Sequence, residues 1–192
     1  SVNAADVEVL DGFVLVRMAA PLRPAHHSVG SDVAGVVEDV GPGVDALAPG
    51  DEVMGDTSGC GFGGFAEYVA IRADVLSRKP STTTFDEAAA IPQAGVLALQ
   101  GLRKAGVTQG TRLLMNGAGG GVGTFAIQMA KVIGAEVTAV DDGGKLEMLR
   151  SIGADHVLDY REEDFATRGE RYDAVLDVAA RRSVFAHRRV LR

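Results

Sequence analysis

Residues 115–135, MNGAGGGVGTFAIQMAKVIGA, join a glycine-rich turn to an amphipathic stretch, and five of the glycines fall within residues 117–123. The preceding TRLLMN predicts a short strand. Apolar residues after the turn recur with a 3.6-residue period, which predicts a helix that ends at Gly134. A strand, a glycine turn and a helix in this order are typical of a Rossmann unit, where the turn approaches a pyrophosphate and the helix N-terminus binds it.

The glycines do not spell G-x-G-x-x-G, because the best register places an alanine in the first slot. Alanine is compatible with that slot if it takes the turn with a negative φ. The flanking strand and helix favour a dinucleotide-binding loop. The alternative is that the glycines only allow the strand and the helix to pack closely. The predicted loop residues are Ala118, Gly119, Gly120, Gly121, Val122 and Gly123.

Strands and helices continue to alternate after the loop, through EVTAV, KLEMLRSIG, HVLDY and DAVLDVA. This alternation predicts a parallel, doubly wound sheet, and the terminal RRSVFAHRRVLR is expected to form a solvated helix on it. The first eighty residues instead predict β structure, with strands over residues 31–40, 51–55 and 64–71.

Helices are expected to connect these two parts. Thr84 and Glu87 form a capping-box pattern before a helical run in which Pro92 would kink or restart the helix. The sequence therefore predicts an α/β protein with a β domain over residues 1–82, connecting helices over 83–105 and a Rossmann-type domain over 106–192.

Two opposed signals follow the second Rossmann strand. Asp141 and Asp142 end that strand, and Asp141 lies close to the offset of a carboxylate that binds the ribose 2′-hydroxyl, which favours NAD. Lys145 and the pair Tyr160–Arg161 stand where they would face an adenosine phosphate, which favours NADP. Structural roles are the alternative, with Asp142 capping the next helix and Lys145 a solvated charge.

The net charge of −7 argues against affinity for nucleic acids or anionic membranes. No apolar run is long enough to cross a bilayer. The single cysteine, Cys60, excludes an internal disulfide and favours a cytoplasmic protein. Because the chain begins at Ser1 without an initiator methionine, we expect it to be a fragment.

Several stretches occur together in a known order: SVNAAD, GSDVAGVVEDVGPGV, GDEVMG, GGFAEYV, EAAAIPQAGVLALQGL, NGAGGGVGTFAIQMAK and GADHVLDYREEDF. With them the chain resembles the medium-chain dehydrogenase/reductase superfamily, and within it the zinc-free quinone oxidoreductases that include ζ-crystallin. The resemblance implies a GroES-like β-barrel on the substrate side followed by a Rossmann domain. Both are expected to be incomplete, since such relatives extend beyond both ends of this chain.

The resemblance also implies roles for individual residues. Asn3 matches an asparagine close to the nicotinamide and the substrate, and residues 118–122 match the pyrophosphate loop. Lys145 and Tyr160 match positions that hold the adenosine phosphate in NADPH-dependent relatives, so the implied cofactor is NADP or NAD, with NADP preferred. Asp141 and Asp142 depart from the small or hydroxylic residues of those relatives.

Zinc-dependent relatives carry a histidine–glutamate pair where GSDVAG has Ser31 and Asp32. His26 and His27 lie nearby without a cysteine at ligand spacing, so we predict no metal.

Without zinc, the chemistry implied is hydride delivery to a quinone or an α,β-unsaturated carbonyl, in a protein that relatives suggest is a homodimer. No general acid is identified: Tyr68 is more typical of barrel structure, and Leu97 replaces a threonine found in many relatives. One alternative is a non-catalytic nucleotide-binding or structural protein of this fold. Another is a methyltransferase, but the GroES-like half of the chain argues against it.

Overall fold

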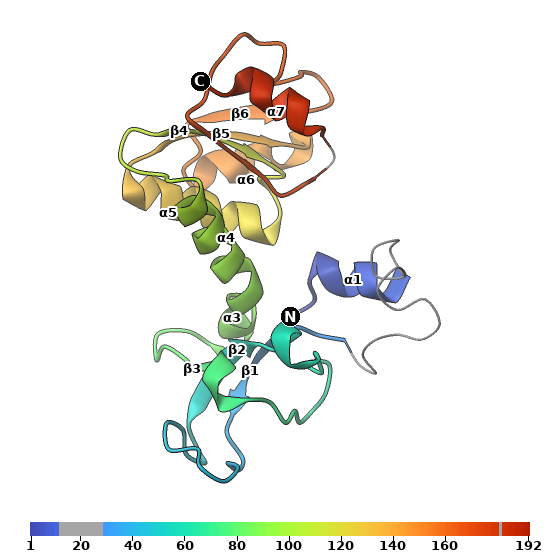
Figure 1. Ribbon diagram of the computed structural model, residues 1–192, viewed down its shortest axis with the longest axis vertical. Helices are drawn as coiled ribbons and strands as arrows, with labels where there is room; N and C mark the ends of the chain where they lie inside the picture. Colours follow the sequence, from blue (N-terminus) through green and yellow to red (C-terminus); the bar gives the residue numbers. More distant parts are fainter. Residues whose placement is uncertain (12–28, 181) are drawn as a thin grey trace. The chain divides into compact units, whose positions relative to one another are not determined.

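The computed structural model describes residues 1–11, 29–180 and 182–192. These residues form two compact units, Ser1–Gln93 and Ala94–Arg192, whose elements are labelled in Figure 1. The division falls inside the segment expected to connect the two domains.

The described part of the first unit is built on an open antiparallel sheet in the order β1-β2-β3. Its elements are α1 (Ala4–Asp11), β1 (Asp32–Val36), β2 (Glu52–Asp56), η1 (Ser58–Cys60), η2 (Ala73–Val75), β3 (Leu76–Arg78) and α3 (Phe85–Ala89). The first two strands fall within or beside the predicted ones. The sheet is consistent with a GroES-like domain whose barrel is not closed by these strands.

The strand predicted over residues 64–71 is wrong. The amides of Gly64 and Phe65 donate to the carbonyls of Gly30 and Val29, at 2.8 and 3.2 Å, and the residues that follow are not in a strand. The third strand is β3, which pairs with β2 from Val53↔Arg78 to Gly55↔Leu76. Tyr68, in the middle of the predicted strand, is 75% exposed.

Helix α1 lies where only β structure was expected. The Asp6 carboxylate accepts a hydrogen bond from the Asn3 amide at 2.8 Å, and its other oxygen accepts one from the Gly30 amide at 2.9 Å. Asp6 is 1% exposed, so this one side chain starts the helix and fastens it to the segment before β1. The N-x-x-D pattern of residues 3–6 was the available signal.

The connecting helices confirm two predictions. Thr84 accepts from the Glu87 amide at 3.2 Å while the Glu87 carboxylate accepts from the Thr84 amide at 2.8 Å, which is the expected capping box at the start of α3. Pro92 is the first residue of α4 (Pro92–Lys104), so the helix restarts there.

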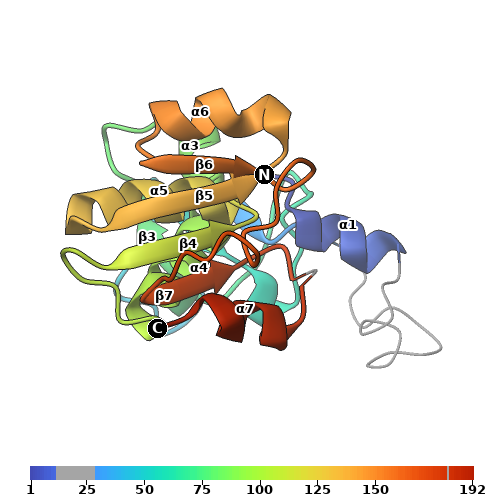
Figure 2. The same ribbon diagram turned by 90° about the horizontal axis from the view of Figure 1, so that it is seen from above.

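The described part of the second unit has an α/β fold. Its four-stranded sheet is entirely parallel, in the order β6-β5-β4-β7. Figure 2 shows the strands side by side in that order. The predicted strands and helices are confirmed as β4 (Arg112–Asn116), α5 (Gly121–Ile133), β5 (Glu136–Asp141), α6 (Leu146–Ser151), β6 (His156–Asp159), β7 (Ala174–Asp177) and α7 (Val184–Val190). The short helix η3 (Gly143–Lys145) before α6 was not predicted. Gly134 ends α5 in the left-handed conformation, with φ of 92°.

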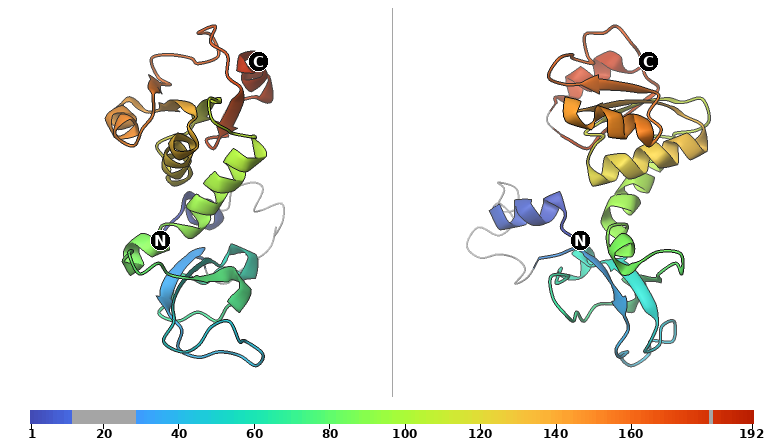
Figure 3. Two further views of the ribbon diagram at one scale, coloured as in Figure 1. Left: turned by 90° about the vertical axis from the view of Figure 1, so that its left-hand side faces the viewer. Right: turned by 180° about the vertical axis from the view of Figure 1, so that it is seen from behind.

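Side chains of β4 alternate between two cores on opposite faces of this sheet. Leu113 and Met115 lie in one core with Ile127 of α5, and Leu114 lies in the other with Val190 of α7. Figure 3 shows α5 and α7 on opposite sides of the sheet. Burial of each such large side chain stabilises the fold by about 1.5–3 kcal/mol.

The chain changes direction across the sheet at β4. From β4 it proceeds to β5 and β6 on one side, then crosses to β7 on the other. The last residues of β4 and β7 are joined by a hydrogen bond from Asn116 Nδ2 to Asp177 Oδ1 at 2.9 Å. In open α/β sheets the carboxyl ends of two such strands flank the crevice in which ligands bind.

None of the helices in the described ranges has both the length and the apolar character that a membrane span requires.

Candidate dinucleotide site

The loop after β4 begins with a left-handed turn at Gly117, where φ is 82°. The amides of Gly117 and Ala118 both donate to the Val140 carbonyl, at 3.0 and 3.1 Å, which fastens the turn to β5. Ala118 is fully buried and is not among the residues with positive φ, so alanine is accommodated as predicted. The glycine that makes the turn is therefore Gly117, which is not among the predicted loop residues. The Asn-Gly dipeptide at residues 116–117, typical of a tight turn, was the signal that could have found it.

Two of the predicted glycines have close neighbours. A Cβ at Gly123 would lie 2.6 Å from both Cα and the carbonyl carbon of Ala118, and closer still to its oxygen. A Cβ at Gly119 would overlap the side chain of Lys145 and lie 3.1 Å from the Asp141 carboxylate. At Gly123 the neighbours are backbone atoms, which fits the alternative of a packing role. At Gly119 they are side chains, and that of Lys145 is 48% exposed and can move aside.

Packing does not account for Gly120. Its φ of −90° and ψ of 173° are open to any residue, and a Cβ there would meet only the Gly117 oxygen, at 3.7 Å. At Gly121, next in the chain, a Cβ would make an ordinary 3.4 Å contact with Ala94. Val122 packs against the core that contains Leu113 and Met115. No side chain of the described ranges caps α5. The amides of the first turn of α5 therefore have no side-chain cap, which suits an anion such as a diphosphate.

Asp141 closes one side of the loop. Its Oδ2 accepts from the Gly119 amide at 2.7 Å, while Oδ1 accepts from the Asp142 amide at 2.8 Å and lies 3.0 Å from Nζ of Lys145. Burial opposes ionisation of this carboxyl, but the amides of Asp142 and Gly119 and the ammonium of Lys145 outweigh it, so the pKa of Asp141 lies below its ordinary value. The Asp141 side chain is only 10% exposed, and its carboxylate holds the loop through the Gly119 amide.

Asp142 faces the neighbouring charges at the end of β6. Its Oδ1 accepts from the Gly144 amide at 3.0 Å, which confirms the expected capping role, here on the short helix η3. Its Oδ2 pairs with the Arg161 guanidinium. That guanidinium lies 5.8 Å from the ring centroid of Tyr160, and the Tyr160 amide donates to the Asp141 carbonyl at 3.2 Å. The second unit thus brings together every predicted cofactor residue that it contains.

Asn3 lies in the first unit, away from these residues in the chain. Its Nδ2 donates to Ser31 Oγ at 3.0 Å and to Asp32 Oδ2 at 2.8 Å. Asp32 also lines an open hollow of about 1190 Å³ that extends along β1 to Tyr68 and Arg72. Asp32 thus connects Asn3 with this hollow, although Asn3 is not among the residues that line it.

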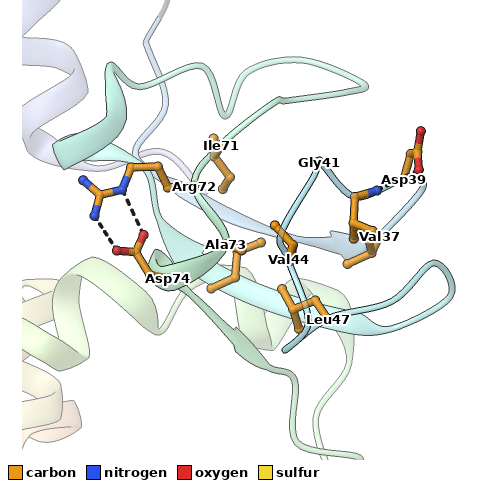
Figure 4. A pocket seen from close by; sticks show the side chains of 11 residues that line it. Val37, Asp39, Gly41, Val44, Leu47, Ile71, Arg72, Ala73 and Asp74 are labelled. Carbon is orange, nitrogen blue, oxygen red and sulfur yellow. Dashed lines mark hydrogen bonds and ion pairs between the residues drawn. The ribbon is translucent and has the colours of Figure 1, made fainter.

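A smaller hollow of about 430 Å³ adjoins the larger one and shares Val37, Ile71 and Arg72 with it (Figure 4). Val37, Val44 and Ile71 give it an apolar lining, and the only charge contact drawn there is between Arg72 and Asp74, which are paired with each other. None of the predicted site residues lines it, so it adds nothing to the candidate site.

Leu97 lies on α4 and is 49% exposed. His26 and His27 lie outside the described residues, and in the ranges that are described no three potential ligands gather as a metal centre would require. Metal-free chemistry therefore stays a prediction.

Two protein families match the chain. The family described as alcohol dehydrogenase GroES-like domain matches residues 1–81, and the family described as zinc-binding dehydrogenase matches residues 121–188. Together with the parallel sheet of the second unit, these matches confirm the predicted order of a GroES-like and a Rossmann-type domain.

Curated and solved proteins are similar over most of the chain. The 2-methylene-furan-3-one reductase of Solanum lycopersicum is 45% identical over 156 residues, covering 77% of this chain and 40% of that protein. The chloroplast envelope quinone oxidoreductase homolog of Arabidopsis thaliana is 36% identical over 191 residues, covering 93% and 56%. The crystal structure of Escherichia coli quinone oxidoreductase complexed with NADPH aligns with a TM-score of 0.87 at 28% identity, covering 100% and 59%. The chain thus spans about half the length of the relatives it matches.

Proposed function

The chain belongs to the medium-chain dehydrogenase/reductase superfamily, and on that premise we propose that it is part of an NAD(P)H-dependent oxidoreductase acting on a quinone or an α,β-unsaturated carbonyl. The two substrate classes follow the names of its relatives, a quinone oxidoreductase homolog and a reductase of 2-methylene-furan-3-one. The bound dinucleotide would supply the hydride, and this chain would bind and orient it without a metal ion.

One observation carries the proposal: Gly120 stands in front of an uncapped helix, although neither its backbone angles nor its neighbours require glycine. A dinucleotide explains why the position lacks a side chain, because the diphosphate must approach the amides of α5 closely. Asp141 holds the Gly119 amide and so keeps the loop in shape.

Nucleotide binding and turnover test the proposal directly. We expect NADPH or NADH to bind the purified full chain at micromolar concentration, as measured by the change in nicotinamide fluorescence, and to be oxidised when a quinone or an enone is added. Binding without turnover on either acceptor class would favour a non-catalytic nucleotide-binding protein. Binding of S-adenosylmethionine in place of both dinucleotides would contradict the proposal.

For the choice of cofactor, we propose that NADP(H) is preferred and is bound at the 2′-phosphate by Lys145, Tyr160 and Arg161. Side chains of Lys145 and Arg161 are 48% and 66% exposed, so both cations are accessible at this edge of the sheet. Asp141, the candidate for a ribose 2′-hydroxyl, already receives two amides and one ammonium, which argues against the NAD reading. Asp142 moderates the preference, because it pairs with Arg161 and repels a phosphate.

Replacing Asp142 with asparagine is expected to strengthen NADPH binding about threefold to tenfold while NADH binding changes less than about twofold. The amide oxygen still caps η3, since asparagine and aspartate are equivalent caps, but Arg161 is released for the phosphate. Fluorescence titrations with both cofactors measure the ratio. Glu147→Gln, which removes an equal charge from an exposed position of α6, is the matched control. An equal change for both cofactors, or the same shift in the control, would remove Asp142 and Arg161 from the site.

The cellular setting and the assembly stay predictions. We propose a cytoplasmic protein from its single cysteine, although one matched relative is named for the chloroplast envelope. A homodimer is proposed from the resemblance alone, and size-exclusion chromatography with light scattering tests it.

A further inference from the structure

Asp177, the last residue of β7, joins several pieces of the second unit. Its Oδ1 accepts from Asn116 Nδ2 at 2.9 Å and from the amides of Ala179 and Ala180, each at 3.1 Å. Its Oδ2 lies 3.1 Å from Nε2 of His187 on α7, and the side chains of both residues are only 15% exposed. The Asp177 carboxylate therefore ties the end of β4, the loop after β7 and α7 to one another.

The loop after β7, residues 178–180, has a shape that its surroundings impose. Ala180 has a φ of 50°, in the left-handed region that residues other than glycine rarely adopt. Such a residue persists only where its neighbours hold it in that conformation. Because the Ala180 amide is bound by the Asp177 carboxylate, Asp177 stabilises the bend of the loop as well as its place.

This loop lies against the turn that leads into the glycine loop. The Val178 amide donates to the Asn116 carbonyl at 3.0 Å. A Cβ at Gly117 would lie 2.9 Å from the Ala179 nitrogen, so the two backbones pack directly against each other. The two segments follow β4 and β7, the strands whose carboxyl ends flank the crevice. Residues 178–180 therefore form the β7 side of that crevice, as the glycine loop forms its β4 side.

We propose that Asp177 is a positioning residue for the cofactor: it holds residues 178–180 in place beside the turn at Gly117 before a dinucleotide binds. This rests on the proposed function and adds to it a residue outside the glycine loop. Both oxygens of Asp177 already have partners within the second unit, so the residue acts through the loop that it holds. A loop that is ordered beforehand need not lose conformational freedom when the ligand arrives, which strengthens binding.

Asp177→Ala removes the acceptor that Asn116 and the two loop amides share. We expect NADPH and NADH each to bind at least about tenfold more weakly in fluorescence titrations, because the unpaired amides no longer hold the loop. The two losses should be equal, since the cofactors differ only at the ribose 2′-phosphate. Asp177→Asn keeps an oxygen for the three donors and turns its NH2 group to His187, whose neutral imidazole can accept a hydrogen bond. In this variant both affinities should stay within about threefold of the original values.

Asp173→Ala is the matched control, because Asp173 lies directly before β7, at the opposite end of the strand from Asp177. Its Oδ2 accepts from the Arg112 amide at 2.9 Å, and its Oδ1 pairs with Arg192 at 2.9 Å. The control therefore also removes a carboxylate that binds a backbone amide, but at the edge of the sheet away from the crevice. We expect it to unfold at a lower urea concentration while the affinity for either cofactor changes less than about twofold.

Hydrogen exchange followed by NMR tests the order of the loop without any substitution. The amides of Ala179 and Ala180 should exchange slowly before a cofactor is added, and protection that appears only with NADPH would overturn the inference. It is equally overturned if Asp177→Ala binds both cofactors as tightly as before, if Asp173→Ala weakens them as much, or if Asp177→Asn does not preserve the affinity. Should the unchanged protein bind neither cofactor, the proposed function itself fails, while slow exchange of the two amides would still support the hold of Asp177 on the loop.

Discussion

Replacing Gly123 with alanine is expected to destabilise the second unit by about 3 kcal/mol or more, at the upper end of the cost of overpacking a core. The added Cβ would lie 2.6 Å from two backbone atoms of Ala118. Those atoms cannot turn away as a flexible side chain does, because Ala118 is fully buried and its amide is bound to the Val140 carbonyl. A domain is stabilised by only about 5–15 kcal/mol, so such a loss is a large fraction of the total.

Urea unfolding of the full chain without cofactor measures this effect, and Gly121→Ala is the matched control. At Gly121 the new Cβ would make an ordinary 3.4 Å contact with Ala94, and alanine in a helix is preferred to glycine by about 1 kcal/mol. The control should therefore unfold at an equal or higher urea concentration. Equal midpoints for Gly123→Ala and the unchanged protein would mean that the strand and the helix are not packed as closely as the structure has them.

The second unit could be predicted almost completely from its sequence, because each element carries its own local signals. The helix after the glycine loop, for example, has an apolar period and a terminal Gly134, which mark it whatever surrounds it. The first unit could not be predicted as well. Residues 64–71 alternate like a strand, yet a strand also needs a neighbour to pair with, and pairing here ends after the amides of Gly64 and Phe65.

The site shows the same division between local and distant causes. Sequence spacing correctly located Asp141 at the end of β5, but it did not predict the ion pair of Asp141 with Lys145. Spacing did not show that the Asp141 carboxylate accepts from the Gly119 amide, because that contact depends on how β4 and β5 align. The offset rule for a ribose-binding carboxylate therefore found the right residue and suggested a role that the hydrogen bonds of the loop argue against.

Replacing Gly120 with aspartate is expected to weaken NADPH binding at least about a hundredfold while leaving the fold as stable as before or slightly more so. Gly120 is the N-cap of α5, with φ of −90° and ψ of 173°, and aspartate is favoured at such a position. Its carboxylate would accept from the amides of the first turn and sit at the positive end of the helix dipole. The diphosphate would then lose its donors and meet a like charge.

Gly120→Ser and Gly120→Asn are the matched controls, because both cap the helix without adding charge. If the diphosphate binds at this helix end, affinity should fall in the order glycine, then serine or asparagine, then aspartate, while thermal unfolding temperatures do not fall. A joint loss of binding and stability would mean that position 120 needs glycine for the fold, contrary to its open surroundings. Unchanged NADPH affinity in the aspartate variant would mean that the diphosphate does not approach α5, and the oxidoreductase proposal would lose the observation that supports it.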